Sequence, residues 1–375
     1  MNVFMLLSKP WSYGGCETHV FSLITGLRDR GHEVVICFEG KKKQPQLDGV
    51  GATQYPLRFR TPNPFALRKT REQLRNIVRD HAIDVIHAHT RTGCFWGSRL
   101  NNEFGVPYTV TLHCLWSRLY SRVMQPFLPE TMISVSLGIR DYFNQTYHVP
   151  RERIVIIHNG VDTARLQKES KPKPRDDERV RLAYISRLNE DKGKLAITLL
   201  KAMEELFVSI PISLSIAGDG CKFEDVKTVA QRLNERCGQE CVTMLGRCGD
   251  IPRLLQDVDI VIGTGRAAAE AMAAGKPVVA IASEEKFMGL VTPRNARAMH
   301  ERNFAGSGKR LSAETFVNEL LPVLRNPAYR EALGSFSARF AVDVMSNDRM
   351  VEKVLSLYET LIADGKSGAN PRHPT

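Results

Sequence analysis

Short aliphatic runs alternate with longer segments of helical periodicity along nearly the whole chain. Such short apolar runs, bounded by turn residues, predict buried strands, and a period of about 3.6 residues over the longer segments predicts helices. Strands that alternate with helices predict an α/β chain in which parallel sheets carry helices on both faces. In the first half the runs are Val3–Leu7, Val34–Phe38, Val85–His87, Tyr108–Leu112, Thr131–Val135 and Ile154–Ile157.

The alternation breaks after HNGVD (158–162) and then resumes. The stretch KESKPKPRDDER that follows is charged, contains prolines and has no apolar periodicity, so it predicts a linker or an edge loop. We therefore expect two Rossmann-like domains in tandem, at 1–162 and 163–341, followed by a disordered tail at 366–375. In the second half the runs are Arg181–Ile185, Ile212–Ala217, Val242–Leu245, Val258–Ile262 and Pro277–Ile281.

The apolar segments are too short for a membrane protein. Met1–Leu7 is shorter than a signal peptide needs, and no apolar stretch approaches the 18 or so residues of a membrane span. The eight cysteines show no Cys-x-x-Cys spacing, and a chain of 375 residues does not need disulfides to fold. We expect a cytoplasmic protein with reduced thiols.

Two sets of residues invite a metal interpretation. Cys237, Cys241 and Cys248 have no fourth ligand at the spacing of a tetrahedral site, and Cys241 begins an apolar run. His87 and His89 alternate on one strand, where such a pair is typical of hydrogen-bonded structure. We expect no metal.

Positive charge is concentrated in the first half of the chain. Residues 1–168 contain 22 Lys and Arg against 13 Asp and Glu, a net charge of +9, whereas residues 169–375 contain 30 against 28, a net charge of +2. The region 41–79 is dense in Lys and Arg interleaved with aromatic residues. It is either a solvated basic surface or a binding face for an anionic membrane, an acidic substrate or nucleic acid. No nucleic-acid signature is present, so we expect no nucleic-acid partner.

The stretch VIGTGRAAAEAMAAGKPVVAI (261–281) contains a phosphate-binding pattern with two interpretations. Gly263, Gly265 and Ala268 form a G-x-G-x-x-A sequence between an apolar run and a helix, and Glu284 follows about 20 residues later. That pattern is typical of NAD-dependent oxidoreductases, but there it follows the first strand of the domain. Here it follows the fourth, so the oxidoreductase remains an alternative.

Other turns at strand ends supply candidate ligand contacts. In SYGGCETHV (12–20), Gly14 and Gly15 permit close approach of a ligand to a helix N-terminus. His113 in TLHC ends another strand, and in SRLNEDKG the cations Arg187 and Lys192 could clamp a diphosphate. Two further glycine turns, AGDG and LGRCGD, are consistent with a nucleotide lying along this edge. Their candidate contacts are Gly218, Gly246 and Arg247.

Seven segments occur together in one order: GGCETHV, DVIHAH, SVSLGIRDYF, IVIIHNGVD, SRLNEDKG, AGDG and EAMAAGKPVV. In this order they resemble the retaining glycosyltransferases of family four, over nearly the whole chain. The resemblance implies the GT-B fold, in which two Rossmann-like domains face a cleft. It also implies that the helical stretch near 342–365 crosses back to the first domain.

The resemblance assigns roles to several residues. Glu270 takes the place of the second glutamate of an E-x₇-E pair, which holds the nucleotide ribose. The first glutamate falls on position 262, where this chain has Ile262. In its absence we expect the glycine loop to survive and to hold the sugar and phosphate through free backbone N–H groups. The donor-binding residues there are Gly263, Thr264, Gly265 and Arg266.

The resemblance also implies a reaction, the transfer of a sugar from a nucleoside-diphosphate sugar with retention at the anomeric carbon. Arg187 and Lys192 would stabilise the departing diphosphate without a cofactor or metal. His113 would line the sugar and Gly15 would close on the diphosphate.

The resemblance also leads us to expect particular substrates and a particular cellular location. A UDP-sugar is favoured, with a GDP-sugar as the alternative, and the acceptor is a glycan or lipid-linked molecule of bacterial envelope assembly. The basic region 41–79 is then a candidate for peripheral contact with an anionic membrane. A catalytically inactive relative that only binds ligands is the other alternative.

Overall fold

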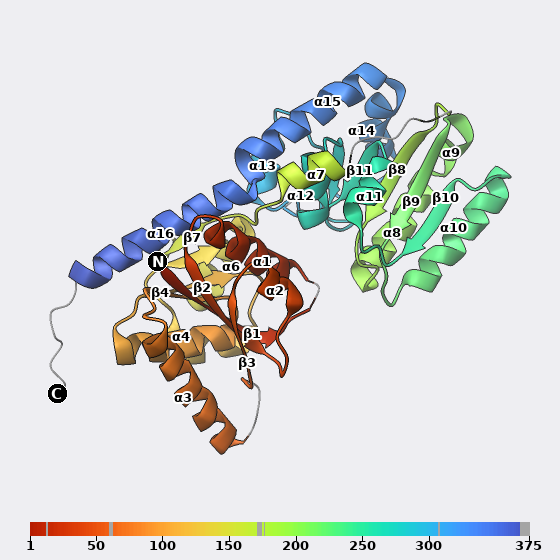
Figure 1. The fold of residues 1–375 in the computed structure, drawn as a ribbon. Coiled ribbons are helices and arrows are strands. Elements are labelled where there is room, and N and C mark those ends of the chain that lie inside the picture. Colours follow the sequence, from red (N-terminus) through yellow and green to blue (C-terminus); the bar gives the residue numbers. More distant parts are fainter. Residues whose placement is uncertain (13, 60–62, 171–174, 176, 307, 368–375) are drawn as a thin grey trace. The chain divides into compact units, whose positions relative to one another are not determined.

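The computed structural model describes residues 1–12, 14–59, 63–170, 175, 177–306 and 308–367. Contacts divide the chain into two compact units, Met1–Gly160 with Asn347–Thr375, and Val161–Ser346 (Figure 1). The boundaries expected from the sequence, after residues 162 and 341, lie a few residues away. Of the tail expected at 366–375, residues 368–375 lie outside the described residues and the first two end a helix.

The first unit contains a parallel seven-stranded sheet in the order β3-β2-β1-β4-β5-β6-β7. Its strands are β1 (Asn2–Pro10), β2 (Glu33–Glu39), β3 (Thr53–Leu57), β4 (Val85–Ala88), β5 (Tyr108–Leu112), β6 (Met132–Ser134) and β7 (Ile154–Ile156). Its helices are α1 (Gly15–Arg28), α2 (Pro45–Gly49), α3 (Pro64–Asp80), α4 (Arg91–Phe104), α5 (Ser121–Met124), α6 (Leu137–Tyr147) and α16 (Asn347–Ser367), with 3₁₀ turns at Arg118–Tyr120, Gln125–Phe127 and Arg151–Arg153.

The central strand β1 shows why this sheet needs helices on both faces. Residues 3–7 are all fully buried, and they alternate between two apolar cores. Phe4 and Leu6 join the core on one face, while Val3, Met5 and Leu7 join the core on the other. An uninterrupted apolar run is therefore the expected sequence for a strand covered on both sides.

Helix α16 completes the core of the first unit against α1. Val351 and Val354 are fully buried in the same core as α1. At Gly26 on α1 a Cβ atom would lie 2.5 Å from Cγ2 of Val351, so only glycine fits at this approach. The helix begins at Asn347 rather than near 342, because Ala341–Met345 forms a π-helical turn of the second unit and Ser346 is extended.

The second unit contains a six-stranded sheet in the order β10-β9-β8-β11-β12-β13, with β13 antiparallel to β12 and the other neighbours parallel. Its strands are β8 (Val180–Ile185), β9 (Ile212–Ala217), β10 (Val242–Gly246), β11 (Ile260–Gly263), β12 (Val278–Ile281) and β13 (Phe287–Leu290). Its helices are α7 (Thr163–Glu169), α8 (Glu190–Ala202), α9 (Glu204–Ser209), α10 (Phe223–Cys237), α11 (Ile251–Gln256), α12 (Gly265–Ala273), α13 (Ala296–Glu301), α14 (Ala313–Arg325) and α15 (Pro327–Phe340).

These two sheets confirm the predicted α/β class with one Rossmann-like sheet in each half. Strand order reverses between β1 and β4 in the first unit and between β8 and β11 in the second. In open α/β sheets ligands bind beyond the carboxyl ends of the strands at such a reversal. The strand order therefore singles out two edges, one in each unit.

None of the helices in the described part of the chain combines the length and apolarity needed to cross a bilayer.

Candidate functional site

At the reversal in the second unit, α8 follows β8 and presents the predicted cations. Arg187 is exposed in the connecting loop, and Lys192 lies in the first turn of α8, whose N-terminus is capped by the side chain of Asn189. The ammonium of Lys192 donates a hydrogen bond to the carbonyl oxygen of Ala282, which follows β12. Burial lowers the pKa of Lys192 to about 8. A partly buried lysine whose hydrogen-bond partner in the described part of the chain is a neutral carbonyl is suited to bind an anion.

The loops after β8 and β9 are packed backbone against backbone. A Cβ atom on Gly218 would lie 1.8 Å from the carbonyl oxygen of Ser186, and Gly218 has φ +155°. A Cβ atom on Gly220 would lie 2.4 Å from the carbonyl oxygen of Leu188. Gly218, which the sequence suggested as a ligand contact, thus lets the loop that carries Arg187 pack closely against the end of β9.

The next strand end, after β10, is joined to the same backbone network. The carbonyl oxygen of Gly246 accepts a 2.7 Å hydrogen bond from the amide of Gly218. Gly246 has φ +64°, a left-handed conformation that favours glycine. Arg247 follows and is exposed. The ends of three neighbouring strands, β8, β9 and β10, are therefore linked through glycines.

The connection between β11 and α12 differs from the expected glycine loop. Gly263 is the last residue of the strand and Gly265 the first of the helix, so Thr264 alone connects them. The amide of Gly265, expected to be free for a ligand, donates a 3.0 Å hydrogen bond to the carbonyl oxygen of Asn303. The hydroxyl of Thr264 donates a 2.6 Å hydrogen bond to the carbonyl oxygen of Phe304. The segment near 303 therefore occupies groups that the sequence assigned to a ligand.

Arg266 and Glu270 lie one turn apart on α12 and form an ion pair, with Nε of Arg266 2.7 Å from Oε1 of Glu270. The Glu270 side chain is 15% exposed. Ile262, by contrast, is fully buried and pairs within the sheet with Tyr184 and Val279. The position where the resemblance implied the first glutamate is thus a core position of β11 and not part of a loop.

In the first unit, Gly14 caps α1 and Gly15 begins it. A Cβ atom on Gly14 would lie 2.8 Å from Oε2 of Glu17, whereas a Cβ atom on Gly15 would contact nothing within 4 Å. Burial alone would raise the pKa of the Glu17 carboxyl, but hydrogen bonds from Lys9 and Ser12 lower it below its usual value. Glu17 therefore fixes the loop before α1, a role that its place in the helix turn did not reveal.

His113 follows β5 and lies beside two other histidines. Its Nε2 atom is 3.2 Å from Nδ1 of His89, which follows β4, and its ring centre is 4.8 Å from that of His19 on α1. Burial holds the pKa values of His89 and His113 well below their usual range. Sequence reasoning singled out His113 and missed His19, because a single histidine inside a helix carries no local signal.

His87 has the structural role that the sequence predicted. Its Nδ1 atom is 2.5 Å from the hydroxyl of Tyr358 on α16, and its Nε2 atom is 2.7 Å from the hydroxyl of Thr111 on β5. One ring nitrogen therefore joins β4 to α16, and the other joins β4 to β5.

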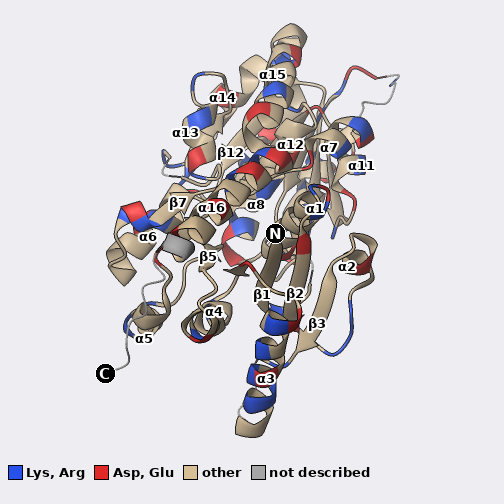
Figure 2. Cartoon of the chain, turned by 60° about the vertical axis from the view of Figure 1, so that its left-hand side comes forward, with Lys and Arg blue, Asp and Glu red and all other residues tan. Residues whose placement is uncertain are grey.

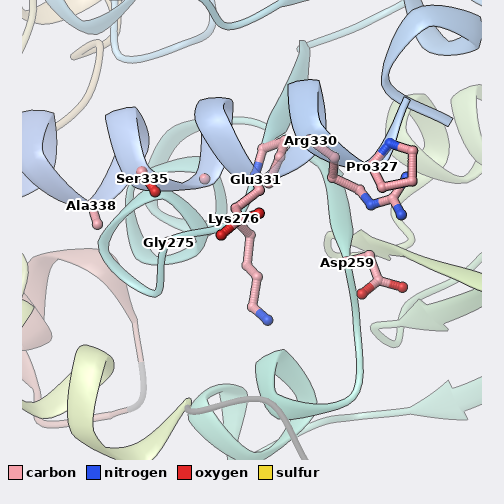
Figure 3. Close-up of a pocket in the computed structure, with 10 residues that line it drawn as sticks. Asp259, Gly275, Lys276, Pro327, Arg330, Glu331, Ser335 and Ala338 are labelled. Carbon is pink, nitrogen blue, oxygen red and sulfur yellow. The ribbon is translucent and has the colours of Figure 1, made fainter. Parts of the chain in front are cut away.

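A separate cavity of about 470 Å³ lies at the opposite edge of the second sheet. It is lined by residues that precede β11 and β12 and by one side of α15, as Figure 3 shows. Among them are Asp259, Lys276 and Arg330; burial lowers the pKa of Lys276. No residue predicted for the ligand site lines this cavity.

Glu284, the acid required by the oxidoreductase alternative, is already hydrogen-bonded, and the adjacent Glu285 is ion-paired. Oε1 of Glu284 accepts a 2.5 Å hydrogen bond from the hydroxyl of Thr198 on α8. Glu285 forms an ion pair with Arg310 at 3.2 Å. The pattern GTGRAA also follows β11, the fourth strand of its unit, so the arrangement disfavours a nicotinamide site.

Comparisons with known proteins agree with the geometry of both units. The model of Glycosyltransferase Family 4 matches residues 13–165, and that of Glycosyl transferases group 1 matches residues 166–340. EpsD of Bacillus subtilis (strain 168), named as a glycosyltransferase, is 26% identical over 286 residues, covering 68% of this chain and 72% of EpsD.

Two solved structures show the same fold at low sequence identity. Anabaena Alr3699/HepE in complex with UDP-glucose has a TM-score of 0.71 at 18% identity, covering 96% of this chain and 100% of that chain. The lipopolysaccharide outer core galactosyltransferase WaaB has a TM-score of 0.64 at 15% identity, covering 95% and 99%. With two matching family models in tandem and this fold, the chain belongs to the family-four glycosyltransferases of the GT-B fold.

Proposed function

We propose that this glycosyltransferase moves a sugar from a nucleoside-diphosphate sugar, a UDP-sugar by preference, to a glycan or lipid-linked acceptor, with retention at the anomeric carbon. The observation that carries the donor assignment is the position of Arg187 and Lys192 beside the strand reversal of the second sheet. A UDP-glucose complex of Alr3699/HepE, which shares the fold, favours uridine over guanosine.

Each cation has a distinct part in the proposed chemistry. As the bond between the sugar and the diphosphate breaks, negative charge builds up on the leaving phosphate oxygens. Arg187 can form a forked pair with such oxygens, and Lys192 acts as a point charge. Lys192 would exchange its hydrogen bond to Ala282 for the diphosphate, which stabilises the ammonium that burial otherwise disfavours. Glu270 would accept hydrogen bonds from the ribose hydroxyls.

The sugar is held differently in this proposal from the family pattern. Position 262 is a buried isoleucine, so it offers the sugar no carboxylate. Arg266 on α12 is the side chain of the second unit that we assign to the sugar. The departing phosphate oxygen accepts the acceptor's proton, so the mechanism uses neither a general base from the chain nor a metal.

Calorimetric titration with UDP, GDP and ADP tests the donor assignment. We expect UDP to bind, and Arg187→Ala and Lys192→Ala to weaken it, while Lys201→Ala in the last turn of α8 serves as the matched control. Absence of binding by all three nucleotides would contradict the proposal. Saturable UDP binding without any release of UDP from UDP-sugars and candidate acceptors would instead support the inactive relative.

For the acceptor we propose an anionic membrane surface that presents a lipid-linked molecule of bacterial envelope assembly. The likeness to WaaB supports this setting. Basic residues line α3, as Figure 2 shows, but they are not equivalent. Arg71 and Arg75 pair with Glu103 on α4, and Arg79 lies over the ring of Phe104.

The remaining charges of this region are exposed. Arg68 and Lys69 near the start of α3 lie close in sequence to Phe65, which is 81% exposed. Lys41–Lys43 and Arg58 are exposed as well, and Arg60 lies outside the described residues. A combination of exposed cations with an exposed aromatic ring suits the interface of an anionic bilayer.

Vesicle sedimentation with anionic lipid at low salt tests the membrane surface. We expect binding to fall when Arg68→Gln and Lys69→Gln are combined, and to change little with Arg75→Gln, whose charge is already paired. Equal vesicle binding by the parent, the double variant and Arg75→Gln would contradict the membrane proposal and leave the donor proposal intact.

A further inference from the structure

The three histidines at the strand reversal of the first unit form a cluster that the glycosyl transfer proposed above does not need as a group. His19 is contributed by α1, His89 by the segment after β4 and His113 by the segment after β5. Each offers one ring nitrogen, and these three atoms lie within 4.8 Å of one another. We propose that His19, His89 and His113 form a binding site for a first-row transition metal ion, Zn²⁺ by preference.

The spacing of the rings fits a tetrahedral metal. Zinc bound to histidine nitrogens at about 2.0–2.1 Å requires neighbouring nitrogens about 3.3 Å apart and ring centres about 5 Å apart. The His89 and His113 nitrogens are 3.2 Å apart. The three ring centres are separated by 4.8, 5.5 and 5.9 Å. The three ligand nitrogens lie within 4.8 Å of one another, and the longest separation has to shorten to about 3.3 Å for all three to reach one ion.

The chemical state of the rings also suits metal binding. A metal binds the neutral imidazole, and the side chains of His19 and His89 are buried, where the uncharged ring is favoured. Nε2 of His89 is buried, and no described residue forms a hydrogen bond with it. Nδ1 of His89, which lies 3.2 Å from Nε2 of His113, is the atom that faces the proposed ion, and Nε2 then carries the ring hydrogen.

Neighbouring groups define the ligand set. The ring of His87 lies against that of His89, with 4.1 Å between ring centres, but its two nitrogens are hydrogen-bonded to Tyr358 and Thr111, so it is not a ligand. Lys9 places a positive charge near His113, but Glu17 pairs with it at 2.8 Å. Three nitrogen ligands without a fourth side chain correspond to an ion that also binds water, and imidazole ligands favour zinc, copper, nickel or cobalt over magnesium or calcium.

Cobalt titration tests the site directly, since four-coordinate Co²⁺ absorbs visible light strongly and Zn²⁺ does not. We would use chelator-treated full-length protein without a polyhistidine tag. We expect one Co²⁺ per chain with a four-coordinate spectrum, and stoichiometric displacement by Zn²⁺. No saturable spectrum, or a spectrum with the charge-transfer bands of cysteine thiolates, would overturn the proposal.

Two variants locate the site and one serves as control. His19→Gln and His89→Gln should each weaken Co²⁺ binding about 100-fold or more. His148→Asn removes an exposed histidine at φ +51°, a conformation that asparagine tolerates, and should bind Co²⁺ as the parent does. Circular dichroism confirms that each variant is folded. Unchanged binding in both folded cluster variants would overturn the proposal; if both unfold, the stoichiometry and the spectrum of the parent decide.

The metal and donor proposals can fail separately. UDP binding to the parent, measured in the presence of a chelator, reports on the donor site alone. Cobalt binding in the absence of nucleotide reports on the histidines alone.

Discussion

Arg266 and Glu270 are bound to each other on the first turns of α12, with 2.7 Å between Nε and Oε1. The resemblance assigned Glu270 to the ribose, and we assigned Arg266 to the sugar, so the ion pair couples the two proposed donor contacts. Arg266 holds the Glu270 carboxylate in one orientation before a donor arrives. Such a fixed carboxylate loses less conformational entropy on binding ribose hydroxyls.

Glu270→Gln should weaken UDP binding about 10-fold to 100-fold, because charge-assisted hydrogen bonds contribute about 1.5–3 kcal/mol. Arg266→Gln keeps the carboxylate and loses only its orientation, so we expect a loss of less than about tenfold. Calorimetric titration measures both. An unchanged affinity in Glu270→Gln would show that the ribose is held elsewhere.

UDP affinity should fall as pH rises through about 8, the pKa to which burial lowers Lys192. Below that pH the ammonium is charged and attracts the diphosphate; above it, binding must take up a proton. Titration in buffers of different ionisation enthalpy should detect that uptake near pH 9. Lys192→Arg, whose guanidinium stays charged, should bind with little pH dependence. A parent affinity that is flat from pH 7 to about 9.5 would contradict this assignment.

The same shift has a consequence for the stability of the ligand-free protein. Between pH 8 and the usual lysine value of 10.5 the unfolded chain binds the proton that folded Lys192 has lost. The contribution of Lys192 to stability therefore rises with pH across this window. Lys192→Met should raise the melting temperature more at pH 7 than at pH 10. The reverse order would indicate that the ammonium is stabilised in the ligand-free fold.

Gly218→Ala should destabilise the second unit by more than about 2 kcal/mol, since the added Cβ would lie 1.8 Å from the Ser186 carbonyl oxygen. The matched control is Gly249→Ala, where a Cβ atom meets nothing within 4 Å. Urea unfolding compares the two. Equal stabilities would mean that the loops after β8 and β9 separate easily.

Strands were predictable from the sequence where both faces are buried. The run Val34–Phe38 is apolar throughout and forms the body of β2. By contrast, β3 is an edge strand containing Gln54 and Pro56, and its sequence has no apolar run. Strand β13 has four residues with a glycine at φ +85° and runs antiparallel, so neither its length nor the alternation with helices indicated it.

The candidate site was predictable where it depends on a strand end, and not where it depends on distant residues. Lys192 follows β8 as its sequence suggested. The amide of Gly265 is hydrogen-bonded to the carbonyl oxygen of Asn303. The ring of His19 lies beside that of His113, although the two residues are far apart in the sequence. No periodicity or motif encodes such pairs, because only the fold brings them together.

Tyr358→Phe should lower the stability of the first unit by about 1–3 kcal/mol, because it leaves the buried Nδ1 of His87 without the hydroxyl at 2.5 Å. A folded variant with a lower urea midpoint is the expected result. Tyr329→Phe is the control, since no described residue forms a hydrogen bond with its hydroxyl. Equal midpoints for the two variants would show that α16 does not need this bond to pack on β4.

Ile262→Glu should fail to restore the glutamate that the family pattern places at this position. The side chain of Ile262 is fully buried within β11, so a carboxylate there would lose its hydration without gaining a partner, at a cost of several kcal/mol. Ile262→Val keeps the site apolar and should cost only about 0.5–1.5 kcal/mol.

Thermal melting and titration with UDP-glucose measure both effects of this change. We expect Ile262→Glu to melt well below Ile262→Val and to bind UDP-glucose no more tightly than UDP. A stable Ile262→Glu protein with a gain in affinity for the sugar would show that β11 ends earlier in solution and that position 262 faces the donor. In that case Ile262 would simply have replaced a glutamate that faces the donor. In the structure, by contrast, only Thr264 lies between β11 and α12, so position 262 is inside the strand and cannot face the donor.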